Sequence, residues 1–316
     1  MPFERWVSLA GNVIAPATAI SALLFYFGYV SSRSQYEYFG LDVDTIGLTT
    51  QGFIMRSPQP LLVPLLVLSV VGAGAVLVNA AIRRRLTSGY AHPEPGPAIR
   101  VRRWIGRATA GGLLLMAAGF VLLLLYPLLR DWPSFNLGTP LVIALGGSIA
   151  TYAIGASRFA GNLESVSDPG QDPAALASGS PATPSARSSP VLLRPAVSVF
   201  ILVAVAASIF WATATVAQWT GVGLAQSQAQ RLDELPSVIL DTKERLFLTS
   251  PGINEVALPP STGQTFHYRY RHLQLLIQGE GRMFLVPDKW SPSDSTMLVR
   301  LDPSVRMQFQ FTNQAP

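Results

Sequence analysis

The stretch that decides the fold is Ala108–Leu129, which reads ATAGGLLLMAAGFVLLLLYPLL and contains no Asp, Glu, Lys, Arg or His. Its 22 residues exceed the roughly 20 that a helix needs to cross a hydrocarbon core about 30 Å thick. Consecutive apolar residues such as Leu122–Leu125 lack the alternation of a barrel strand. Because lipid offers no hydrogen-bond partners to the backbone, the stretch is predicted to be a transmembrane helix.

Four further segments have the same length and the same lack of charge: Val7–Val30, Leu61–Ile82, Leu137–Ala156 and Pro195–Trp219. Hydrophobic residues make up 49% of the 316-residue chain and charged residues only 13%, against about 25% in soluble globular domains. The sequence therefore predicts an α-helical integral membrane protein with a five-helix bundle in residues 1–219.

Arginines set the predicted orientation of this bundle. Seven of them lie between the second and third spans, against the single acid Glu94: Arg83, Arg84, Arg85, Arg100, Arg102, Arg103 and Arg107. With a cytoplasmic N-terminus, the inner segments hold 11 arginines and the short outer loops hold three. Positive charge marks the cytoplasmic side, so the C-terminal domain is predicted to be extracytoplasmic. A second interpretation is that the cluster binds anionic headgroups, which would make membrane lipid a partner.

The expected setting is the plasma (inner) membrane of a bacterium. Arginine outnumbers lysine by 21 to two, a bias that suits a GC-rich bacterial genome. The first span is interpreted as an uncleaved anchor, since its apolar run is longer than that of a cleavable signal.

Three segments are distinguished outside the spans. Residues 164–190 are rich in Pro, Gly, Ser and Ala, which predicts a disordered cytoplasmic linker. Residues 220–236 continue the fifth span as a helical stalk that ends at Pro236. Residues 237–316 then change to a β pattern and are predicted to form a small antiparallel domain, either a sandwich or a partly open barrel.

Two hairpins and one long strand are expected in this domain. The first hairpin would pair Val238–Leu240 with Leu246–Leu248, and the last would pair Met297–Leu301 with Val305–Phe311. Between them a strand at Thr265–Gln278 would turn at residues 279–281 into Met283–Val286.

The apolar face of the long strand changes phase. Tyr268 and Tyr270 have even numbers, whereas Leu273, Leu275 and Ile277 have odd ones. One extra residue restores the alternation, so a bulge or break is expected near Arg271–His272.

The polar side chains of the long strand, His267, Arg269 and Arg271, have two interpretations. They form either a solvated strand face or a recognition face for a carboxylate or a partner strand.

The first outer loop, residues 31–60, is unusually apolar for a linker. Gly40 suits the position that ends a helix, and Thr49 or Thr50 suits the cap of a short helix that runs to Arg56 before Pro58. One interpretation is a lid packed on the outer end of the bundle. The other is a segment docked against the C-terminal domain or another subunit.

Catalysis is not expected. Gly146–Ala150 resembles the surroundings of an intramembrane serine nucleophile, but no histidine or lysine lies in a span to act as its base. Small residues at four-residue spacing, where helices approach closely, explain this stretch better. They are Gly147, Thr151 and Gly155 in the fourth span and Gly11, Ala15 and Ala19 in the first.

The sequence also argues against several kinds of ligand. The chain has no cysteine and no His-Glu-x-x-His motif, so neither a thiolate metal site nor another metal or cofactor is expected. Residues from 222 onward carry nine basic and nine acidic side chains, which argues against a nucleic-acid partner.

Three functions were weighed on these grounds. The favoured one is a non-catalytic envelope scaffold or accessory subunit, with a protein partner or a homo-oligomer formed through the bundle or the β domain. The alternative is a subunit of an uncoupled channel or transporter. A membrane-anchored extracytoplasmic enzyme comes third.

Overall fold

The computed structural model describes residues 2–90, 96–129, 132, 134–167, 193–248 and 250–310. Its helices are α1 (Pro2–Glu37), α2 (Val43–Ile46), α3 (Thr50–Arg56), α4 (Pro58–Tyr90), α5 (Gly96–Leu124), α6 (Tyr126–Leu129), α7 (Phe135–Ser167) and α8 (Leu193–Ala229). Five of them, α1, α4, α5, α7 and α8, are long and apolar enough to cross a membrane. The linker prediction for residues 168–190 lies outside the described residues, and residues 164–167 belong to α7.

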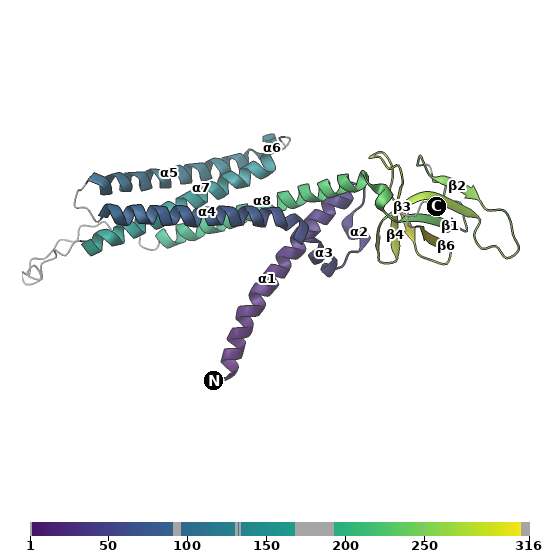
Figure 1. Cartoon of the computed structure of the whole chain (residues 1–316), viewed down its shortest axis with the longest axis horizontal. Coiled ribbons are helices and arrows are strands. Elements are labelled where there is room, and N and C mark those ends of the chain that lie inside the picture. The colour runs from purple at the N-terminus through teal and green to yellow at the C-terminus, as the bar shows by residue number, and fades with distance from the viewer. Residues whose placement is uncertain are drawn as a thin grey trace, which may run out of the picture. The chain divides into compact units, whose positions relative to one another are not determined.

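The chain forms two compact units, which are described separately. Unit 1 contains residues 1–64 and 216–316, and unit 2 contains residues 65–215. Unit 1 therefore brings the N-terminal helix, which ends at Glu37, together with the β domain, which begins at Ser237 some 200 residues later. Figure 1 shows the course of the chain through both units.

Close approach of α5 and α7 holds unit 2 together. A Cβ atom built on Gly112 would lie 2.7 Å from the Ala150 backbone nitrogen, and one on Gly146 would lie 2.5 Å from the Met116 backbone nitrogen. Glycine is thus required on both helices, because any side chain would push the two backbones apart. On the neighbouring face of α7, a Cβ on Gly147 would lie 2.5 Å from Val205 Cγ2 of α8.

Most of the apolar surface of unit 2 is not covered by protein. The most apolar stretch of α4 buries none of its residues, and even that of α7 buries only 39%. Large exposed side chains include Leu66, Leu77, Leu114, Leu124 and Phe200. A soluble protein rarely exposes so much contiguous apolar surface, so these helices suggest a membrane environment.

The β domain is one six-stranded antiparallel sheet. Its strands are β1 (Ser237–Thr242), β2 (Asn254–Ala257), β3 (Tyr268–Gly279), β4 (Arg282–Pro287), β5 (Met297–Arg300) and β6 (Val305–Gln310). The order across the sheet is β5-β4-β3-β1-β6, and β2 also pairs with β3. A short 3-10 turn, η2 (Leu232–Glu234), connects α8 to β1.

Both predicted hairpins are wrong. Leu246–Leu248 is not a strand, and β1 pairs instead with β3 and β6. The strands β5 and β6 exist, but they lie at opposite edges of the sheet rather than beside each other. Val299 of β5 and Met307 of β6 nevertheless pack against the same core as Leu240. The sheet is therefore curled, which allows the short connection 301–304 to span its two edges.

The bulge predicted near Arg271–His272 is confirmed. Val238 pairs with Leu273 and Leu240 pairs with Tyr270, so β3 has one residue more than β1 between these pairs. His272 takes a positive φ of 64°, which is uncommon for a residue other than glycine. A second bulge lies between Leu275 and Ile277, where β3 gains a residue relative to β4. It places Ile277 on the opposite face from Leu273 and Leu275, contrary to the prediction.

The first outer loop begins and ends its short helices as the sequence predicts. After α1, Gly40 has a φ of 74°, and the amide of Leu41 donates to the Tyr36 carbonyl oxygen at 2.9 Å. Thr49 Oγ1 caps α3 by accepting a hydrogen bond from the Gly52 amide at 3.1 Å.

Residues 31–60 pack against one face of the sheet. This agrees with the second interpretation of the loop, in which it docks against the C-terminal domain. The shared core joins side chains of the loop, of the end of α8 and of β3 and β4: Tyr36, Phe39, Val43, Ile46, Phe53, Ala225, Leu232, Leu276, Ile277, Phe284 and Val286. Thr296 Oγ1 donates to the Phe39 carbonyl oxygen at 2.6 Å. A Cβ on Gly279 would lie 2.1 Å from the Ile46 carbonyl oxygen, so the two backbones touch there. The β domain is consequently fixed to the ends of α1 and α8 within unit 1.

Candidate functional site

A buried carboxylate organises the polar face of the sheet. The Asp241 side chain is 0% exposed, and its two oxygens accept hydrogen bonds from two arginines on the flanking strands. Arg269 Nε lies 2.8 Å from Oδ1 and Arg306 Nη2 lies 2.6 Å from Oδ2. The three side chains tie β3, β1 and β6 together across the sheet.

These contacts change the acid–base properties of the cluster. Burial raises the pKa of Asp241, but the hydrogen bonds and charges of Arg269 and Arg306 outweigh it, so the pKa lies below its ordinary value of 3.8. The same carboxylate raises the pKa of Arg269. The carboxylate is therefore ionised at neutral pH, and it is shared by the guanidinium groups of Arg269 and Arg306.

The three residues of the predicted recognition face lie in different surroundings. His267 Nδ1 lies 3.1 Å from the Lys243 carbonyl oxygen, which requires the proton on Nδ1. Arg269 belongs to the Asp241 cluster. Arg271 lines a neighbouring polar pocket. Arg306, which sequence reasoning did not single out, is joined to Arg269 through the Asp241 carboxylate, which both side chains contact.

The polar pocket has a volume of about 540 Å³ and is lined by Arg271, His272, Gln274 and Asp288, among others. His272 Nδ1 lies 3.1 Å from Asp288 Oδ2, and the Asp288 amide donates to the His272 carbonyl oxygen at 3.0 Å. In the described part of the chain, no hydroxyl forms a hydrogen bond with the His272 ring, and no group of three potential metal ligands occurs. The geometry can orient a ligand, but it does not assemble a nucleophile with its base.

An apolar seam lies at the opposite side of the curled sheet, and we define it as Leu246, Phe247, Leu298 and Leu301. All four side chains are substantially exposed, Phe247 to 70%. A cavity of about 320 Å³ lies between β5, β1 and the segment 246–248, with Leu246 and Leu298 in its wall. In the described residues no strand pairs with the outer edge of β5, so backbone donors and acceptors lie next to an apolar surface.

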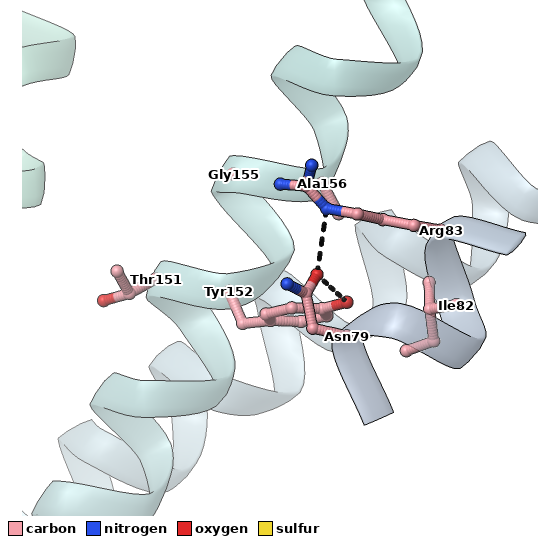
Figure 2. Close-up of a pocket in the computed structure, with 7 residues that line it drawn as sticks. All are labelled: Asn79, Ile82, Arg83, Thr151, Tyr152, Gly155 and Ala156. Atoms are coloured by element: carbon pink, nitrogen blue, oxygen red, sulfur yellow. Dashed lines mark hydrogen bonds between the residues drawn. The ribbon is translucent and has the colours of Figure 1, made fainter. Parts of the chain in front are cut away.

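Unit 2 contains a small polar pocket between α4 and α7 (Figure 2). Asn79 Oδ1 accepts two hydrogen bonds there, from Arg83 Nε at 3.2 Å and from the Tyr152 hydroxyl at 3.3 Å. The pocket has a volume of about 280 Å³. It adjoins a larger apolar groove of about 770 Å³, and the two share Ile82, Tyr152 and Ala156.

The predicted arginine cluster lies at the end of unit 2 that contains this polar pocket. Arg83 and Arg84 are on the last turns of α4, and Arg103 and Arg107 are on the first turns of α5. The helices also contain Arg85, Arg100 and Arg102, whose side chains lie outside the described part.

The predicted helix-packing residues do not all lie at contacts. Gly147 faces Val205, and Thr151 Oγ1 donates to the Gly147 carbonyl oxygen at 2.8 Å. A Cβ on Gly155 would meet nothing within 4 Å. Ala15 and Ala19 of α1 are exposed, and the surroundings of Gly11 are outside the described part. The close backbone approach of α5 and α7 uses Gly112 and Gly146, which the four-residue spacing did not indicate.

Comparison of the chain with known protein families, with curated proteins and with solved structures finds no match.

Proposed function

We propose that the protein is a non-catalytic accessory protein of the bacterial inner membrane that presents its C-terminal β domain to a partner protein outside the cytoplasm. The five long apolar helices support membrane insertion, and the excess of arginine between the second and third spans supports the orientation. The docked loop supports the proposal that the helices present the β domain to a partner, because the core around Phe39 and Phe284 holds the sheet against the ends of α1 and α8.

The apolar seam is the feature that favours a protein as the partner. A small domain that buries Val238, Leu240 and Leu285 completely still exposes the four seam side chains. Exposed apolar side chains beside an unpaired strand edge form the surface that an extended segment of another protein recognises, with backbone hydrogen bonds for affinity and pockets for specificity. The Asp241 cluster supports a structural role for the polar face, since its buried carboxylate holds the arginine side chains of both flanking strands.

One experiment on intact cells tests both the sidedness and the partner. The chain has no cysteine, so Phe247→Cys introduces a single thiol at the seam and Ser261→Cys introduces a matched exposed thiol elsewhere in the domain. A membrane-impermeant maleimide with a photoreactive arm should label both variants. Only the seam variant should yield a discrete crosslinked protein adduct after illumination.

The outcomes separate the two parts of the proposal. If neither thiol is labelled until the membrane is opened, the domain is not extracytoplasmic. If both are labelled but the seam gives no adduct beyond that of Ser261→Cys, the seam is not a docking surface. As a second criterion, Leu298→Asp should abolish the adduct while leaving thermal unfolding of the purified protein unchanged, because Leu298 is exposed.

A further inference from the structure

The apolar groove of unit 2 has the dimensions of a lipid site. Side chains from α4, α5 and α7 line it, among them Val78, Ile82, Ala108, Ile149 and Ala153. Its volume of about 770 Å³ falls within the range of small-ligand sites. Along α7 it runs from Ser148 to Ala156, which is about 12 Å of helix. One leaflet of hydrocarbon is about 15 Å thick, so the groove covers most of the depth of one leaflet.

The two ends of the groove differ in polarity. Trp104 lines it near the start of α5 and is 73% exposed, in the manner of tryptophans at a membrane interface. The same end meets the polar pocket, where Arg83 and Tyr152 share the Asn79 oxygen (Figure 2). The opposite end is formed by Ala75 and Ser148 and lies toward the middle of the helices.

Charge distinguishes the polar end further. Residues 83–107 contain seven arginines and one acid, and Arg83, Arg103 and Arg107 lie on the helix turns that border this end. Anionic lipid headgroups are attracted to such clusters by about 1 kcal/mol per basic residue, which is about a fivefold preference. A helix from a partner protein would have to bring acidic side chains to membrane depth, where they are costly.

We propose that this groove binds one acyl chain of an anionic phospholipid, with the headgroup held at the polar end by Arg83 and Arg103. An apolar channel of leaflet depth and a cationic, hydrogen-bonding mouth match the two halves of such a molecule. Trp104 lies beside the acyl chain and reports on its presence.

The test uses quenching of Trp104 fluorescence. The purified full chain is reconstituted in phosphatidylcholine vesicles that contain increasing minor fractions of either phosphatidylglycerol or phosphatidylcholine with brominated chains. The Trp104 signal is the difference between the wild type and Trp104→Phe. Because each of the two arginines contributes about a fivefold preference, brominated phosphatidylglycerol should quench this signal at about one twenty-fifth of the concentration that brominated phosphatidylcholine requires.

Two kinds of variant test the binding of the headgroup and the binding of the acyl chain separately. Arg103→Gln should lower the preference for phosphatidylglycerol about fivefold, whereas Arg33→Gln, in unit 1, should leave it unchanged. Ala75→Phe narrows the groove from an exposed position on α4 and should reduce quenching by both lipids. Leu77→Phe, on the same helix but outside the groove, is its control.

Three results would overturn the proposal. Equal quenching by the two brominated lipids in the wild type would mean that Trp104 meets only bulk lipid. An unchanged preference in Arg103→Gln would mean that this arginine does not hold the headgroup. Insensitivity of Trp104 to both lipids would mean that protein covers the groove.

Discussion

The two units differ in how far their large apolar side chains are buried. Unit 1 packs large side chains of the first outer loop against the sheet, and Phe39, Ile46 and Phe284 are almost completely buried there. Unit 2 places glycine at its closest helix contacts and leaves large side chains such as Leu114 and Phe200 exposed. The difference shows what each part needs from its surroundings. The hydrophobic effect stabilises the core of unit 1. In unit 2, close backbone contact would be enough to stabilise the helix pairs if lipid covers their exposed apolar side chains.

The largest effect is expected from Phe39→Ala. The ring is 1% exposed and lies 4.8 Å from the Trp290 ring, centroid to centroid, in the core that docks the loop on the sheet. Removing it leaves a cavity and should destabilise the docked loop by about 3–5 kcal/mol. Hydrogen exchange of peptides from residues 36–53, measured on the full chain in detergent, should show the loss as faster exchange.

The control for this variant comes from the other unit. Phe200→Ala removes the same ring from α8, where it is 75% exposed, and should change stability by no more than about 0.5 kcal/mol. Equal losses for the two variants would contradict the contrast between the buried core of unit 1 and the exposed apolar surface of unit 2.

A smaller, pH-dependent effect is expected from Asp241→Asn. The folded-state pKa of Asp241 lies below the ordinary value of 3.8, because Arg269 and Arg306 favour the ionised form. The carboxylate therefore contributes its stabilisation fully above the unfolded-state pKa and loses it as the pH falls through the folded pKa. Near neutral pH the variant should be less stable by about 2 kcal/mol, since two charge-assisted contacts are lost.

Denaturant unfolding of the β domain at neutral and acidic pH checks this expectation. The difference between wild type and variant should shrink on acidification below the ordinary carboxyl pKa. A difference that stays constant with pH would show that Asp241 acts by shape rather than by charge. Glu244→Gln, which changes an exposed acid near the end of β1, is the control and should have little effect at any pH.

Local patterns in the sequence predicted local structure well. The loss of alternation between Tyr270 and Leu273 located the bulge, and Gly40 and Thr49 located the end of α1 and the start of α3. Each of these features depends on the conformation of a few consecutive residues. The hairpins failed because pairing depends on distant partners: β6 pairs with β1, some 65 residues away, rather than with its neighbour β5.

The candidate sites were predicted less completely for the same reason. Arg269 was singled out from its own strand, but Asp241 and Arg306 are joined to it only by the sheet order. The groove of unit 2 combines three helices, and the spacing of small residues along one helix cannot tell which of them faces a partner. Gly155 continues the spacing of Gly147 but faces open space, while Gly146 lies against the backbone of α5.

A comparable difference is expected between two adjacent glycines of α5. A Cβ on Gly112 would lie 2.7 Å from the Ala150 nitrogen and 2.8 Å from the Gly146 carbonyl oxygen, whereas one on Gly111 would meet nothing within 4 Å. Helix propensity favours alanine equally at both positions. Gly112→Ala should therefore lose about 1–3 kcal/mol by overpacking, and Gly111→Ala should lose nothing.

Thermal unfolding of both variants in detergent measures this pair directly. Because the two substitutions are chemically identical and one residue apart, any difference between them reports the contact with α7 alone. If Gly111→Ala proves as harmful as Gly112→Ala, then close backbone approach is not what holds α5 to α7. Unit 2 would then need another source of cohesion, and the contrast with unit 1 would lose its physical basis.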